Sequence, residues 1–189
     1  GGRANVGFGV LRGGRVPIGE TGAIWSGLLE RPEIREVLGE AAVPEGRHMA
    51  WPIPTRISSA VLNHGPVLFT GDAAGATDSL TGEGIGQALL TGTLAAKAIL
   101  AGGPPDSIGS RYRQAVRRDL VADHRMSTAV RHLMSNAMTV DGLVRLAGST
   151  AWTRRNFARW LFEDYPRALL ATPRRWRRGA LSQPGTYRP

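Results

Sequence analysis

Apolar and polar positions divide the chain into a first part with short extended runs and a later part with helical periodicity. The loose alternation of residues 4–11, which ends at two glycines, predicts a strand followed by a turn. The short apolar run 67–70, bounded by turn residues, is typical of a buried parallel strand. Residues 49–57 contain two prolines, which lack the N–H needed in a ladder, so we expect an edge strand or an extended segment there.

In the remaining segments apolar residues recur every three or four positions, as in amphipathic helices. The expected helices cover residues 22–38, 81–101, 108–134, 137–147 and 153–162. Pro32 falls at a helix start within the first of them, and the Gly-Gly-Pro-Pro run at residues 102–105 ends the second. No strand pattern returns after residue 104. The expected fold class is therefore α/β (α+β), with few strands at the N-terminal side and a mainly helical C-terminal region.

The composition excludes several kinds of chemistry. The chain has no cysteine, which excludes disulfides, thiolate metal sites and a cysteine nucleophile, makes the cytoplasm the default compartment and leaves redox chemistry to a bound cofactor. Its four histidines lack metal-ligand spacing, and there is no Gly-x-Ser-x-Gly elbow. The longest nearly apolar segment, residues 88–101, is shorter than the ~20 residues that a spanning helix needs.

Positive charge is concentrated in the later part of the chain. Residues 104–189 hold 16 basic and six acidic side chains, whereas residues 1–103 hold eight and nine. This excess fits a solvated helical face with a disordered tail, or attraction to an anionic membrane surface. No nucleic-acid motif accompanies the charge, so we expect no nucleic-acid partner. Arginines and aromatic residues alternate as in an interfacial helix at Trp152, Arg154, Arg155, Phe157, Arg159 and Trp160. Trp51, Trp152, Trp160 and Trp176 are expected in the core or at an interface.

The segment from residue 67 to residue 88 carries the strongest chemical signal. It contains an apolar strand, a carboxylate directly after it, a glycine-rich loop and a helix N-terminus, which is where ligands bind in open α/β sheets. Asp72 can accept hydrogen bonds from a polyol. Gly82 and Gly84 allow backbone N–H groups to approach a planar ring or an anion at the positive end of the helix dipole. The alternative is a tight turn in which Asp72 is only a local cap.

The same segment resembles the second flavin-binding motif of the flavoprotein monooxygenase superfamily, which is p-hydroxybenzoate hydroxylase-like. It is most similar to the geranylgeranyl reductase branch, with Gly-Asp-Ala-Ala-Gly followed by Gly-Glu-Gly-Ile. The resemblance implies the C-terminal portion of an FAD-binding fold. In that fold Asp72 would bind the ribityl chain of FAD, between Gly71 and Ala73, and the pyrimidine edge of the flavin would lie near the backbone amides of Gly82, Glu83, Gly84 and Ile85. Ser79 stands where the family usually has proline, which would fix φ in the loop.

The family's Gly-x-Gly-x-x-Gly segment, which holds the FAD pyrophosphate, does not occur in this sequence. The resemblance therefore implies that the chain is the C-terminal part of a longer enzyme. Residues 1–64 would belong to its substrate-binding sheet region and residues 65–103 would form the second FAD-binding segment. Residues 104–189 would form a helical region with a basic tail.

The function implied is transfer of a hydride from reduced FAD to a double bond of an isoprenoid lipid, of the geranylgeranyl or prenyl-quinone type. NAD(P)H or another donor would supply electrons, and the enzyme would lie in the cytoplasm at the inner face of the membrane. The alternatives are an FAD-dependent monooxygenase or halogenase, and a non-catalytic basic helical module that binds lipid headgroups. No proton donor is identified, because exposed ion pairing explains Asp78 and Glu83 equally well.

Overall fold

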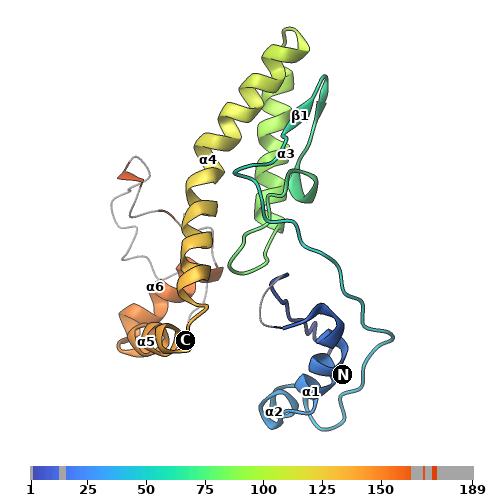
Figure 1. Cartoon of the computed structure of the whole chain (residues 1–189), viewed down its shortest axis with the longest axis vertical. Helices are drawn as coiled ribbons and strands as arrows, with labels where there is room; N and C mark the ends of the chain where they lie inside the picture. Colours follow the sequence, from blue (N-terminus) through green and yellow to red (C-terminus); the bar gives the residue numbers. More distant parts are fainter. Residues whose placement is uncertain (1, 13–15, 163–167, 169–171, 174–189) are drawn as a thin grey trace. The chain divides into compact units, whose positions relative to one another are not determined.

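The computed structural model describes residues 2–12, 16–162, 168, 172 and 173. The chain forms two compact units, Gly1–Trp51 and Pro52–Pro189. Most of the described residues are helical, and the described strands form one two-stranded antiparallel sheet (Figure 1). This agrees with a mixed fold in which helices predominate after a few strands.

The first unit contains short helices and buries none of its described residues. It comprises the 3-10 helix η1 (Ile18–Glu20) and helices α1 (Thr21–Leu29) and α2 (Pro32–Leu38). The helix expected over residues 22–38 is confirmed as two helices, and Pro32 begins the second because its fixed φ and missing N–H suit a first helical turn.

The strand expected over residues 4–11 is wrong, because this segment has no hydrogen-bonded partner strand among the described residues. A strand needs a neighbour for its N–H and C=O groups, and an alternating pattern alone does not supply one. Phe8 instead stacks on Trp25, with 6.2 Å between the ring centroids, and Arg3 pairs with Glu45 at 3.0 Å.

In the second unit, the sheet pairs β1 (Asn63–His64) with β2 (Val67–Leu68). The buried parallel strand expected over residues 67–70 is wrong, since the pair is antiparallel and Val67 is 53% exposed. The two residues between the strands, with Gly65 at φ +52°, close a tight hairpin, so β2 pairs with the segment just before it. The extended segment expected over residues 49–57 is confirmed, with one antiparallel bridge from Thr55 to Ala76.

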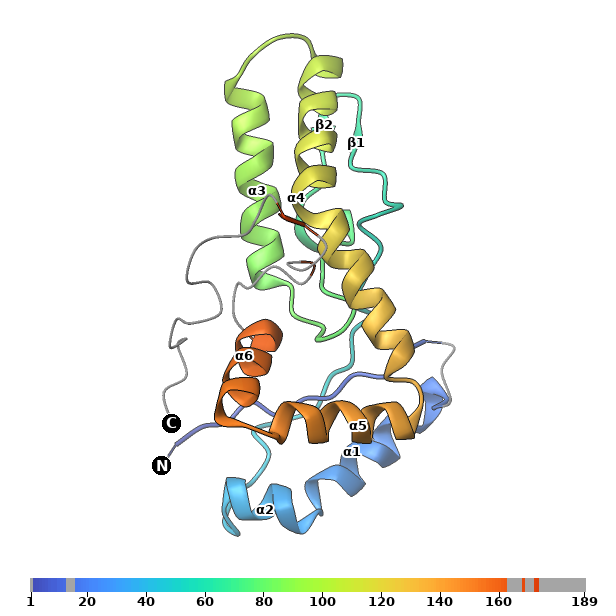
Figure 2. The same cartoon turned by 90° about the vertical axis from the view of Figure 1, so that its left-hand side faces the viewer.

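After β2 the chain forms the 3-10 helix η2 (Gly71–Ala74), a loop, helix α3 (Ile85–Leu100) and helix α4 (Pro105–Leu133). Both long helices confirm the sequence prediction, although α3 begins at Ile85 rather than at residue 81. The two helices pack side by side (Figures 1 and 2). Arg111 on α4 donates to the carbonyls of Ala98 and Gly102, which caps the end of α3.

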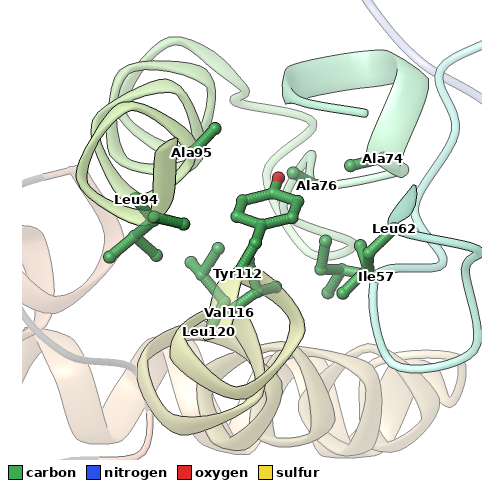
Figure 3. Close-up of a cluster of buried hydrophobic side chains, with 10 residues drawn as sticks. Ile57, Leu62, Ala74, Ala76, Leu94, Ala95, Tyr112, Val116 and Leu120 are labelled. Atoms are coloured by element: carbon green, nitrogen blue, oxygen red, sulfur yellow. The ribbon is translucent and has the colours of Figure 1, made fainter. Parts of the chain in front are cut away.

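The core of this unit surrounds Tyr112 of α4. Its ring is fully buried, and Figure 3 shows it between α3 and the segment that carries Ala74 and Ala76. The Tyr112 hydroxyl donates to the carbonyl of Phe69 at 2.5 Å, which attaches α4 to the end of β2. The buried cluster comprises Ile57, Leu62, Ala74, Ala76, Leu94, Ala95, Ala98, Tyr112, Val116 and Leu120. Its many alanines allow α3 and α4 to approach closely.

Helices α5 (Ala137–Gly148) and α6 (Ala151–Phe162) confirm the two helices expected after α4. Asn136 caps α5 by accepting a hydrogen bond from the Met138 amide at 3.0 Å. Among the described residues beyond Pro104, none lies in a strand. In the described part of the chain, no helix combines the length and hydrophobicity that crossing a bilayer requires.

The core position expected for two tryptophans and the arginine pattern expected for α6 are wrong. A core position is wrong for Trp51 and Trp152, which are 81% and 51% exposed. Arg159 is buried, so the arginines of α6 do not form one solvent-facing row as an interfacial helix would require. Trp176 and the arginine-rich tail from residue 174 lie outside the described residues.

Candidate cofactor site

The glycine-aspartate motif begins where η2 is attached to α3. The Gly71 amide donates to the Thr91 hydroxyl oxygen at 2.9 Å, and the fully buried Thr91 hydroxyl lies 2.8 Å from the Gln87 carbonyl of its own helix. This contact fixes the start of η2 against the second turn of α3. Asp72 and Ala73, the next two residues, are exposed.

The two ends of the predicted motif meet at Thr77. Its hydroxyl donates to Asp72 Oδ1 at 2.8 Å. A Cβ atom added to Gly84 would lie 2.9 Å from the same Thr77 hydroxyl and 3.6 Å from Asp72 Oδ1. Only glycine allows the backbone at position 84 to come this close, so the structure brings Asp72 and Gly84 together across the loop.

The loop between them is closed by its own hydrogen bonds. Asp78 Oδ2 accepts from the amide and the hydroxyl of Thr81 at 3.0 and 2.8 Å. The Asp78 amide donates to the Glu83 carbonyl at 2.9 Å, and the Gly82 amide donates to the Asp78 carbonyl at 3.0 Å. Gly82 has φ +75°, a conformation that suits glycine. The exposed role suggested for Asp78 is wrong, since this residue is only 5% exposed, whereas Glu83 is exposed.

Helix α3 starts at this loop without a side-chain cap. Its N-cap residue is Gly84, which has no side chain to cap the helix, and the first helical hydrogen bond runs from the Ala88 amide to the Gly84 carbonyl at 2.8 Å. The amides of residues 85–87 therefore have no acceptor within the helix. Ile85 is 75% exposed, so this helix start faces outward with the positive end of its dipole.

Beneath the loop lies α4. Ser79 contacts Thr128 of α4, with 3.1 Å between their hydroxyl oxygens. Burial lowers the pKa of the nearby His124 below its usual range, while the negative charge of Asp78 opposes that shift. Thr77, Thr91, His124 and Thr128 were not identified from the sequence. Thr91 and Thr128 contact residues far away along the chain, and the pattern of apolar positions carries no signal for such contacts.

The arrangement fits part of the cofactor that the sequence resemblance implies. The exposed Asp72 carboxylate can accept hydrogen bonds from ribityl hydroxyls, and the exposed backbone of Gly82 lies close to the start of α3. The site is an open surface. A shallow, open concavity of about 190 Å³ lies elsewhere, between α3 and α4. No cluster of potential metal ligands occurs among the described residues.

Comparison with known proteins adds no relative. A scan against protein-family models, a search of curated proteins and a search of solved structures each found no match to this chain.

Proposed function

We propose that the chain carries the riboflavin-binding part of an FAD-dependent oxidoreductase that reduces double bonds of a prenyl lipid. The observation that supports this most directly is the convergence of Asp72 and Gly84 at the uncapped start of α3. A carboxylate for a polyol and free amides for a polar ring edge then lie side by side. Such a pair suits the junction of the ribityl chain and the flavin ring better than it suits a simple turn.

In this proposal Asp72 binds the ribityl chain of FAD, and the start of α3 orients the flavin ring. Asp72 accepts hydrogen bonds from ribityl hydroxyls, while Thr77 holds its other oxygen in place. The amides of residues 85–87 face the pyrimidine edge, where the helix dipole stabilises negative charge by about 0.3–1 kcal/mol. FAD, when bound, supplies hydride transfer, and NAD(P)H or another donor supplies the electrons. The substrate class, a geranylgeranyl or prenyl-quinone lipid, rests on the sequence resemblance, as does the membrane association.

The first test is flavin binding by the complete gene product. We expect purified protein to bind FAD, and Asp72→Ala to weaken binding at least tenfold, because hydrogen bonds to a charged group contribute about 1.5–3 kcal/mol. Asp141→Ala, which removes an exposed carboxylate on α5, is the matched control and should leave binding unchanged. Absence of flavin binding, or equal binding by Asp72→Ala, would contradict the proposal.

A second experiment separates reductase from monooxygenase activity. The bound flavin is reduced with NAD(P)H under anaerobic conditions, and its reoxidation by a geranylgeranyl lipid is followed by absorbance, with the saturated lipid detected by mass spectrometry. Saturated product without oxygen supports the reductase. If reoxidation requires oxygen and yields a hydroxylated or halogenated product, the monooxygenase or halogenase alternative replaces it.

A further inference from the structure

The loop of residues 78–83 is closed internally, but its own hydrogen bonds do not fix its position in the molecule. The bonds that Asp78 makes with Thr81, Gly82 and Glu83 all join residues within the loop. They set its shape. The hydrogen bond from Thr77 to Asp72 and the close approach of Gly84 place the two ends of the loop. A contact with another element can hold its middle.

Ser79 makes such a contact, and its direction follows from the neighbouring bonds. Thr128 Oγ1 donates its hydrogen to the His124 carbonyl at 2.8 Å. A hydroxyl has one hydrogen, so Thr128 can only accept from Ser79, and Ser79 donates across the 3.1 Å separation. Both side chains are partly buried, which protects this hydrogen bond from competition with water.

Helix α4 thereby contacts the motif on both sides. Tyr112 donates to the Phe69 carbonyl just before Gly71, and Thr128 accepts from Ser79 within the loop. Between these two contacts lie Asp72 and Thr77. Two side chains of the same helix, Tyr112 and Thr128, therefore hold the two ends of this segment against α4.

We propose that Ser79 and Thr128 are positioning residues for the cofactor site. Their hydrogen bond sets where the backbone of residues 82–85 stands relative to the Asp72 carboxylate. The inference rests on the proposed function for its consequence in flavin binding, whereas the attachment of the loop to α4 can be tested without flavin.

The first experiment measures hydrogen exchange of the flavin-free protein. We expect Ser79→Ala and Thr128→Val to speed exchange of the Thr81 and Gly82 amides about fivefold, because a loop that has lost one hydrogen bond to α4 opens, and breaks its internal bonds, more often. Thr93→Val is the matched control, because Thr93 also donates to a carbonyl four residues earlier, at 2.8 Å, and is exposed on α3. The Gly71 amide, bonded to Thr91, reports on general loosening and should not change.

The second experiment tests the consequence for the cofactor. Thr128→Val should weaken FAD binding about fivefold and alter the flavin absorption spectrum. Thr128→Ser, which keeps the accepting hydroxyl, should restore both. If the protein binds no FAD, the proposed function is wrong, but the exchange experiment still tests whether Ser79 and Thr128 attach the loop to α4. Unchanged exchange in Ser79→Ala, an equal effect of Thr93→Val, or failure of Thr128→Ser to restore binding would overturn the inference.

Discussion

The core around Tyr112 and the loop of residues 77–84 adjoin each other in the second unit and are stabilised by different interactions. The core consists of buried apolar side chains from α3, α4 and the segment before α3. The loop also contains the buried residues Thr77 and Asp78, but it is held by hydrogen bonds of the side chains of Thr77, Asp78 and Thr81. Burial of apolar surface tolerates small shifts, whereas hydrogen bonds require defined distances and angles.

This difference means that the two regions should respond differently to substitution. Loss of a core side chain leaves a cavity and should lower the stability of the whole unit. Loss of a loop contact should shift backbone amides by a small distance and affect ligand binding more than folding. The following predictions test that separation, beginning with the largest effect.

Tyr112→Ala should have the largest effect on stability. The ring is fully buried, and its removal leaves a cavity between α3 and the residues around Ala74. We expect a loss of about 3–5 kcal/mol in the free energy of unfolding, measured by urea denaturation. A loss below about 1 kcal/mol would show that the core does not depend on this side chain.

High pH should destabilise the same region. Burial raises the pKa of Tyr112 from 10.0 to about 12. The unfolded tyrosine therefore ionises first, so the contribution of the neutral hydroxyl is complete below pH 10 and is lost as the pH rises to about 12. The loss should approach about 3 kcal/mol in urea titrations across this range. Tyr112→Phe should remove this step, and an unchanged step would assign it to another group.

Gly84→Ala should separate ligand binding from folding. The added Cβ would lie 2.9 Å from the Thr77 hydroxyl, which would have to leave Asp72 or move the backbone. We expect about 1–2 kcal/mol of destabilisation and a stronger loss of FAD binding. Gly92→Ala, in α3 with open space around it, should instead stabilise by about 0.5–1 kcal/mol. Equal effects at both positions would remove close approach as the explanation.

His124 should give the smallest effect, which is a pH dependence on the acid side. Burial lowers its pKa, with Arg131 acting in the same direction and Asp78 opposing. The unfolded histidine therefore protonates first, so the contribution of His124 is present above its usual pKa and is lost as the pH falls through the lower pKa of the folded protein. The difference in unfolding free energy between the wild type and His124→Gln should change as the pH falls below about 6.5. Parallel curves would contradict this assignment.

The helices could be predicted because their determinants are local. In α4 the apolar residues that recur every three or four positions include Tyr112, Val116 and Leu120, which are its buried hydrophobic side chains. The strands could not be predicted in the same way, because a strand forms only where a second segment pairs with it. Val67 and Leu68 pair with the residues just before them across a tight turn, and residues 4–11 find no partner among the described residues.

The candidate site was predictable in outline. The positions of Asp72, Gly82 and Gly84 relative to a helix start follow from their order along the chain. The side chains that hold them do not. Ser79 and Thr128 are 49 residues apart, and Gly71 and Thr91 are 20 apart. Serine and threonine occur at many positions of this chain, and only the folded arrangement determines which of them meet.

Because the chain is synthesised from its N-terminus, contacts between residues far apart in the sequence form later than local ones. The Gly71–Thr91 contact can form as soon as α3 has been made, but the partners of Phe69 and Ser79 on α4 are synthesised only afterwards, Thr128 near the end of that helix. Isolated short segments gain little stability before their packing partners exist. We expect the loop of residues 78–83 to reach its final position only after α4 has left the ribosome. A nascent chain stalled before Thr128 would then contain the whole motif, but the loop of the candidate site would not yet be in its final position.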